Sequence, residues 1–301
     1  MVLTLAGGVL TGCQTNGDDQ RQSIVVTYSI LGSIVSEMVG EEASVTVLMP
    51  DGADPHDWEP SARDIEKLNN ADLIVWNGLD LESSIENTVN TAVNKGTNLF
   101  TATDHIDIRH VGDDEHDSHD EHDHDIEDDH EVGAPDPHFW LDPLAMKDVV
   151  TALAAELENS LGLDVADRAR SLESRLDNLH SAISDMTASL PAQNRKLVTG
   201  HHSMGYFARQ YGFELIGAVV PNLSTQAGVS AADIAALIEQ IKEHGVKAVF
   251  IETGTSANLV QQVSAATGAS VIEIAPTELP SDGSYFTFMS NLAEKVVNGL
   301  K

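Results

Sequence analysis

Short apolar runs alternate with longer amphipathic stretches along most of the chain. In the first half, the pattern predicts strands at residues 23–30, 44–49, 72–77 and 97–100, and helices near 31–40, 61–70, 81–95 and 143–161. In the second half, it predicts strands at 196–199, 214–220, 246–252 and 270–274, and helices near 203–211, 230–244, 256–267 and 285–300. Such alternation is typical of parallel sheets covered by helices. Two series of this kind predict an α/β protein with two parallel-sheet lobes.

The clearest periodicity lies between the two series. Apolar residues follow a 4-3 spacing with polar residues in most gaps, at Val165, Ala169, Leu172, Leu176, Leu179, Ile183, Met186 and Leu190. This spacing predicts one amphipathic helix of about 26 residues, about 39 Å long at the rise per residue of an α-helix. A coiled-coil strand is the alternative, but the repeat covers fewer than about four heptads. We expect one long, rigid helix that joins the lobes.

These patterns divide the chain into four parts. Residues 1–22 form an N-terminal tether, 23–163 the first lobe with a loop at about 110–134, 164–190 the linking helix, and 191–301 the second lobe. Within the second lobe, Ser230 and Asp233 have the spacing of a capping box, which predicts the start of a helix there.

The N-terminal part contains the only cysteine of the chain, Cys13. The run Leu10-Thr11-Gly12-Cys13 resembles the lipobox of bacterial lipoproteins, where the chain is cut before the cysteine and the thiol carries lipid. A polar stretch follows like a tether, and the alternative is a free thiol in a frayed tail. A signal peptide begins with a basic region and a longer apolar stretch. Neither is present, so we expect that the natural start lies further upstream.

The charge balance narrows the range of ligands. The 301 residues include 48 acidic and 16 basic ones, which gives a formal net charge of -32. Nucleic acids are bound by clustered lysine and arginine, so we expect no nucleic acid partner. A cation is the ligand that we expect for a protein with such a negative charge. No run of 18 apolar residues is present, so we expect no membrane-spanning helix.

Two histidines in the first half, His56 and His138, each follow an Asp-Pro pair. Proline fixes its own φ and favours extended backbone before it, so a stiff loop presents each imidazole. A tryptophan follows two residues after each histidine, Trp58 and Trp140. Either tripeptide alone is compatible with a turn histidine, but the recurrence indicates two metal ligands.

In the second half, His201 and His202 follow the strand expected at 196–199. Loops at the carboxyl ends of parallel strands are where α/β sheets hold ligands. Neighbouring side chains on an extended chain point in opposite directions, so only one of the two is expected to face a cleft. Two surface histidines are the alternative.

A third group of histidines lies in an acidic segment. Residues 113–131 contain twelve acidic residues, no lysine or arginine, and five histidines, which are His116, His119, His122, His124 and His130. The segment has no apolar periodicity, so we expect disorder without metal. A solubilising acidic loop is the alternative, but histidines at this density beside carboxylates favour weak, multivalent metal binding.

Three stretches together carry a family resemblance, namely DGADPHDWEPSARDIEKLNNADLIVWNGLDLE, DPHFWLDP and VTGHHSMGYFARQYGF. From residue 24 to the C-terminus, the chain resembles the cluster A solute-binding proteins, the zinc- and manganese-binding lipoproteins of bacterial ABC importers. The resemblance implies two α/β lobes joined by a long helix, with one metal in the cleft between them. It implies His56, His138 and His201 as ligands, the last because the Gly-Tyr-Phe run at 205–207 follows at the family's spacing.

The fourth ligand is less regular in this chain. The family usually has an aspartate shortly before a Ser/Tyr segment. In this chain the corresponding sequence is APTELPSDGSYFTF, and the position of that aspartate falls near Thr277. We therefore expect Glu278 as the fourth ligand, with Asp282 or a water molecule as the alternative.

The ligand types favour zinc on chemical grounds. Neutral imidazole suits this borderline cation, whereas manganese prefers carboxylates. Three histidines and one oxygen form an ordinary tetrahedral zinc site. We expect Zn2+ as the bound ion, with Mn2+ as the alternative. Asp54, Asp136 or Asp142 are candidates to orient the histidines through hydrogen bonds.

The resemblance implies a monomeric extracytoplasmic protein that delivers zinc to the membrane permease of an ABC importer. It implies attachment through Cys13 to membrane lipid on the outer face of the cell membrane, which faces the periplasm in cells with two membranes. We expect no enzymatic activity. A zinc hydrolase is one alternative, because three histidines and a water also describe catalytic zinc sites, but no HExxH segment is present. A surface metal buffer or adhesin is another.

Overall fold

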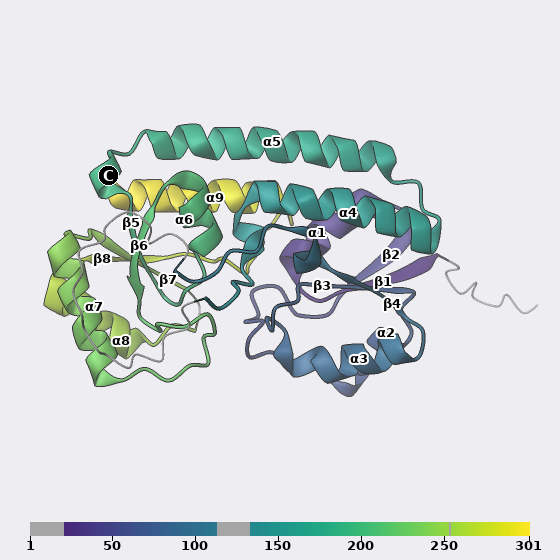
Figure 1. Ribbon diagram of the computed structural model, residues 1–301, viewed down its shortest axis with the longest axis horizontal. Helices are drawn as coiled ribbons and strands as arrows, with labels where there is room; N and C mark the ends of the chain where they lie inside the picture. Colours follow the sequence, from purple (N-terminus) through teal and green to yellow (C-terminus); the bar gives the residue numbers. More distant parts are fainter. Residues whose placement is uncertain (1–20, 113–132, 253) are drawn as a thin grey trace, which may run out of the picture.

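The computed structural model describes residues 21–112, 133–252 and 254–301, which form two α/β lobes (Figure 1). The first lobe has a parallel sheet of order β2-β1-β3-β4, made of β1 (Gln22–Val26), β2 (Ala43–Val47), β3 (Leu73–Trp76) and β4 (Asn98–Thr101). The second has a parallel sheet of order β6-β5-β7-β8, made of β5 (Lys196–Thr199), β6 (Glu214–Ala218), β7 (Ala248–Ile251) and β8 (Ser270–Glu273). The two sheets confirm the predicted fold class.

Helices cover both faces of each sheet. The first lobe contains α1 (Ser29–Val39), α2 (Ala62–Asn69), α3 (Glu86–Asn94) and α4 (Pro143–Leu161). The second contains α6 (Gly205–Tyr211), α7 (Ala231–His244), α8 (Ala257–Thr267) and α9 (Tyr285–Leu300). The capping box predicted at Ser230 and Asp233 is confirmed at the start of α7. Buried strands in both sheets alternate their side chains between two apolar layers, as the period of a strand requires.

The first predicted strand is too long. We expected residues 23–30, but β1 ends at Val26 and α1 begins at Ser29. Thr27 and Tyr28 are residue types that favour strands, and the apolar Ile30 and Leu31 that follow are buried residues of the first helical turn. Between the two elements, the Thr27 hydroxyl donates to the buried carboxylate of Glu82 at 2.6 Å. The sequence pattern therefore does not mark the change from strand to helix.

The predicted linking helix is present as α5 (Ala166–Ala188), which has 23 residues and runs along both lobes above α4 and α9 (Figure 1). Its apolar stripe is buried, including Leu172, Leu176 and Ile183. The guanidinium group of Arg175 pairs with Glu37 of α1 and lies 3.8 Å from the ring centroid of Phe286 in α9. One side chain of α5 thus touches both lobes.

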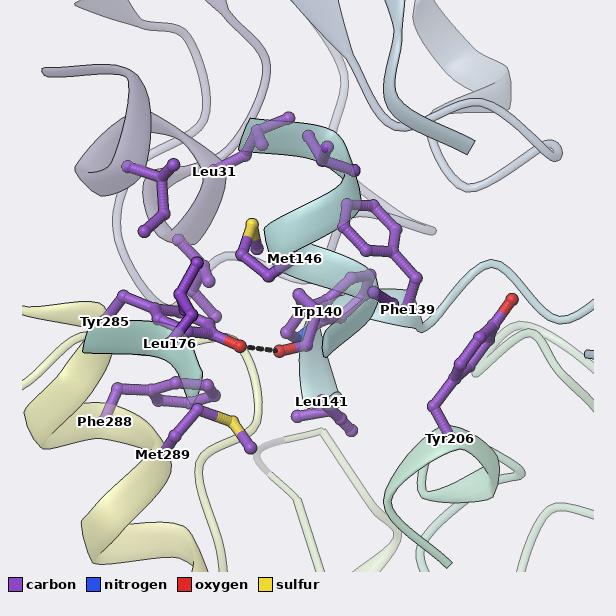
Figure 2. Close-up of a cluster of buried hydrophobic side chains, with 14 of the residues drawn as sticks. Leu31, Phe139, Trp140, Leu141, Met146, Leu176, Tyr206, Tyr285, Phe288 and Met289 are labelled. Carbon is purple, nitrogen blue, oxygen red and sulfur yellow. Dashed lines mark hydrogen bonds between the residues drawn. The ribbon is translucent and has the colours of Figure 1, made fainter. Parts of the chain in front are cut away.

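A single apolar core continues from one lobe into the other beneath α5. Figure 2 shows Trp140 and Met146 of the first lobe packed in one cluster with Leu176 of α5 and with Tyr285 and Phe288 of α9. The Tyr285 hydroxyl donates to the carbonyl oxygen of Trp140 at 2.9 Å. Because apolar burial is continuous here, separating the lobes would expose core side chains to water.

The chain before α9 also fastens the second lobe to the first through main-chain atoms, and we name residues 276–285 the strap. The Trp140 indole N–H donates to the carbonyl of Pro276 at 2.8 Å, and the N–H of Leu279 donates to Asp51 at 3.0 Å. The Ser33 hydroxyl donates to the carbonyl of Gly283 at 2.7 Å and accepts from the N–H of Tyr285 at 3.3 Å. The strap therefore belongs to the contact between the lobes.

Several predicted features lie outside the described residues. These are Cys13 and its lipobox, and the five histidines of the acidic segment, His116, His119, His122, His124 and His130. On either side of that segment, His110 and Pro135 form a short antiparallel pairing. Within the described ranges, no helix combines the length and apolar character that a bilayer crossing requires.

The continuous core and α5 predict that metal binding changes the distance between the lobes very little. Spin labels attached at Glu66→Cys in α2 and Glu243→Cys in α7, in a Cys13→Ser background, report this distance by double electron–electron resonance. We expect adding zinc to shift it by about 1–2 Å, the scale of small helix displacements. A shift several times larger would show that α5 bends or that the core between the lobes separates.

Candidate metal centre

Three histidines from separate segments converge between the lobes. His56 lies in the loop after β2, His138 directly precedes the 3-10 helix Phe139–Leu141, and His201 follows β5. One ring nitrogen from each lies within 4.8 Å of the other two, the only such group of potential ligands in the described part of the chain. Nε2 of His138 is 3.3 Å from Nε2 of His56 and 3.1 Å from Nε2 of His201. Nitrogens placed this closely can share one metal ion.

The surroundings of His56 favour the neutral form of its imidazole ring. His138 and His201 are buried, and His56 is half-buried. Burial, followed by the neighbouring rings of His138 and His201, lowers the pKa of His56 to about 2. A cation needs the lone pair of a neutral ring. His56 therefore keeps a donor atom available at neutral pH.

A buried carboxylate sets the orientation of His138. Asp136 Oδ1 accepts from the ring at Nδ1, 2.8 Å away, and from the backbone N–H of His138 at 3.0 Å. A carboxylate can only accept, so Nδ1 carries the proton and Nε2 is left for a metal. Asp136 Oδ2 is 3.2 Å from the Arg109 guanidinium, which balances its charge. A Cβ at Gly205 would overlap both groups, so the start of α6 has to be glycine for this pair to fit.

A second buried carboxylate supports His201. Glu252 directly follows β7, the neighbour of β5, and its Oε2 lies in ion-pair contact with Nδ1 of His201. Its Oε1 accepts from the Ser203 hydroxyl at 2.8 Å. Burial raises the pKa of Glu252, but the charge and hydrogen bonds of His201 and Ser203 outweigh it and the net pKa is lowered. Glu252 is thus a carboxylate that turns Nε2 of His201 toward the cluster.

Sequence reasoning missed Glu252. Its only signal was its place as the last residue of the strand predicted at 246–252, at the carboxyl edge where α/β sheets gather ligands. Of the three carboxylates proposed to orient the histidines, Asp136 and Asp54 do contact ligand residues. Asp142 instead caps α4 by accepting from the N–H of Leu144 at 2.8 Å.

The two tryptophans that follow the Asp-Pro-His sequences have different surroundings. Trp140 is buried, its ring centroid lies 5.3 Å from that of His138, and it lines the cavity at the cluster. Trp58 packs against the core of the first lobe instead. The cavity measures about 230 Å³, which leaves room for a cation with water beside the imidazoles.

The structure does not bring the expected fourth ligand to the three histidines. Glu278 is exposed, and Asp282 is exposed and accepts from the N–H of Ser284 at 3.1 Å and from the Thr287 hydroxyl at 2.8 Å. Both side chains lie outside the histidine group. They are part of the strap, which is held to the first lobe by its main chain. Thr277 does line the cavity. Of the expected candidates for the fourth ligand, a water molecule is the one that agrees with this geometry.

Of the two adjacent histidines in the second lobe, His201 is the one in the cluster. The backbone N–H of His202 donates to the carbonyl of Asn222 at 2.9 Å, which ties the His201 loop to the loop after β6. The expectation that only one of the pair would face the cleft agrees with this arrangement.

Comparison with known proteins places the chain in a family. The family described as "Zinc-uptake complex component A periplasmic" matches residues 24–299. The chain belongs to the zinc-uptake complex component A family. Membership of this family of binding components agrees with the expectation that the chain is not an enzyme.

Relatives of this family member differ in the metal for which they are named. The manganese ABC transporter substrate-binding lipoprotein PsaA of Streptococcus pneumoniae is 25% identical over 321 residues, covering 100% of this chain and 97% of that protein. The high-affinity zinc uptake system protein ZnuA of Bacillus subtilis is 28% identical over 273 residues, covering 89% and 82%. The structure of the periplasmic zinc binding protein TroA of Treponema pallidum is similar with a TM-score of 0.77 and 25% identity, covering 93% and 99%.

The support of His201 by Glu252 predicts a loss of metal affinity when the carboxylate is neutralised. Glu252→Gln keeps the shape of the side chain but removes the charge that holds the proton on Nδ1. We expect zinc affinity to fall by about 10- to 100-fold, as is typical for partners of metal-bound histidine. Competition with a chromophoric chelator measures this loss.

The same substitution at Glu278 is the matched control, because Glu278 is exposed and lies outside the histidine group. We expect Glu278→Gln to bind zinc like the unmodified protein. Equal affinity of Glu252→Gln and the unmodified protein would contradict the role of Glu252. A larger loss in Glu278→Gln would restore Glu278 as a ligand.

Proposed function

We propose that this protein is the extracytoplasmic zinc-capture component of a bacterial metal-ion ABC importer and hands Zn2+ to the importer's membrane permease. The observation that carries the proposal is the group of His56, His138 and His201, whose ring nitrogens lie within 4.8 Å of one another between two lobes. Two of the rings are held by buried carboxylates, which fix the direction of their Nε2 atoms. Zinc is the cargo of such a site.

The donor atoms support zinc over manganese. Three imidazole nitrogens and one water oxygen make a tetrahedral zinc site, whereas manganese is better served by carboxylate oxygens. In the described part of the chain, no carboxylate joins the three histidines as a direct ligand. Asp136 and Glu252 are engaged at the far nitrogens of two rings instead. Manganese is the second candidate, because relatives such as PsaA are named for it.

The remaining parts of the chain fit this function. The proposal includes a lipid anchor at Cys13 and a monomer that meets the permease on the outer face of the membrane. It also includes weak metal binding by the histidines of residues 113–131. The net charge of -32 attracts divalent cations to the protein surface, and the three-histidine site then selects among them.

Replacing one ligand at a time tests the site. We expect His56→Ala, His138→Ala and His201→Ala each to weaken zinc binding by roughly 100-fold or more, because losing a ligand costs more than losing its hydrogen-bond partner. His202→Ala is the control and should bind like the unmodified protein. Isothermal titration with a competing chelator gives the affinities. Tight binding in His201→Ala together with weak binding in His202→Ala would contradict the assignment.

Metal content and competition test the choice of ion. The protein is purified without an affinity tag and with residues 113–132 deleted, so that only the three-histidine site is counted. We expect one zinc per chain by elemental analysis, and we expect added manganese not to displace it, because imidazole ligands favour zinc. Stoichiometric manganese that zinc does not displace would identify the protein as a manganese-capture component.

A further inference from the structure

The loop that carries His56, residues 50–60, approaches the metal centre from the first lobe, and we name it the His56 loop. Asp54 shapes it from within, because its Oδ1 accepts from the backbone N–H of His56 at 3.0 Å. The backbone N–H groups of Asp57 and Trp58 both donate to the carbonyl of Asp54. His56 is the least buried of the three histidines. Its place therefore depends most on what holds the loop.

The second oxygen of Asp54 is bound by the opposite lobe. Asp54 Oδ2 accepts from the Thr225 hydroxyl at 2.6 Å. Thr225 lies in the loop between β6 and α7, and its side chain lines the same cavity as the three histidines. That loop is itself fixed, since Asn222 accepts from the N–H of Ser224 at 2.8 Å and from the N–H of His202 at 2.9 Å.

We propose that Thr225 is a positioning residue, which holds His56 over the metal site from the second lobe and slows the release of the bound ion. This inference rests on the proposed function. Asp54 connects Thr225 to His56, because one of its oxygens binds the Thr225 hydroxyl while the other binds the backbone N–H of His56. A hydrogen bond to a charged carboxylate is stronger than one between neutral groups. The loops of His56 and His201 are thereby connected without any contribution from the metal.

The His56 loop has one further attachment to the second lobe. Asp51 accepts from the backbone N–H of Leu279 in the strap at 3.0 Å. Both attachments are hydrogen bonds near the rim of the cavity, and Asp51 is exposed. The buried core that joins the lobes is formed by other residues, around Trp140 and Tyr285, and Ala53 and Leu279 pack against it only partly buried. The two bonds can therefore break while the core between the lobes stays intact, which makes the His56 loop the local exit for the ion.

The rate of zinc release from the full-length protein tests the proposal. The protein is loaded with one equivalent of zinc and mixed with excess chromophoric chelator in a stopped-flow instrument. Thr225→Val removes the hydroxyl and keeps the shape of the side chain. We expect release about ten- to a hundredfold faster, which corresponds to the loss of a hydrogen bond to a charged group. Thr225→Ser restores the hydroxyl and is expected to release zinc close to the original rate.

Thr287→Val is the matched control, because the Thr287 hydroxyl also donates to a carboxylate, that of Asp282 at 2.8 Å, but this pair lies outside the histidine group. We expect it to leave the release rate unchanged. In an Asp54→Ala background, Thr225→Val should add nothing further, because the bond is already absent. An additional acceleration there would mean that Thr225 does not act through Asp54.

The outcomes separate this inference from the function on which it rests. Unchanged release from Thr225→Val, or fast release from Thr225→Ser, would overturn the positioning role while tight zinc binding by the unmodified protein still stands. Failure of the unmodified protein to retain zinc would overturn the proposed function, and this inference with it. Equal melting temperatures of Thr225→Val and Thr225→Ser without metal would show that the rates do not reflect a loosened fold.

Discussion

Two buried carboxylates determine how the imidazole rings of the metal centre face one another. Asp136 and Glu252 each occupy the Nδ1 side of one histidine, so His138 and His201 offer Nε2 to the space between the lobes. A carboxylate buried without partners would be costly. Asp136 is balanced by Arg109, while Glu252 is held by Ser203 and the ring itself. The close approach of α6 to the Arg109–Asp136 pair then requires a residue without a side chain.

The Arg109–Asp136 pair, which supports His138, therefore also lies in the contact between the lobes. Tyr206 lies next to that glycine in the second lobe, and its hydroxyl accepts from the backbone N–H of Arg109 at 3.0 Å. The same contact region includes the core beneath α5 and the strap. A wide opening of the lobes would break the bond between Tyr206 and Arg109 as well as the apolar core. The least costly motion is that of a loop, and the His56 loop is joined to the second lobe by the hydrogen bonds of Asp54 and Asp51.

Periodicity predicted most elements of this structure because each helix and strand buries one clear stripe. The 4-3 repeat located α5 to within two residues at either end, and the repeated Asp-Pro-His sequence selected two of the three clustered histidines. Glu252 could not be found this way, since its role depends on β7 lying beside β5 in the sheet. Strand order is a property of the fold that local pattern does not contain. Glu278 was an expectation from family resemblance alone, and the geometry places that side chain outside the cluster.

The strap has a consequence for how this protein changes over evolutionary time. Pro276, Leu279 and Gly283 form their bonds to the first lobe with carbonyl or N–H groups. Every residue type supplies a carbonyl, and every type except proline supplies an N–H. Side chains at the positions between them, such as Thr277 and Glu278, are therefore under little structural selection. The residue that borders the metal cavity can therefore be exchanged over evolutionary time while the frame that joins the lobes is kept.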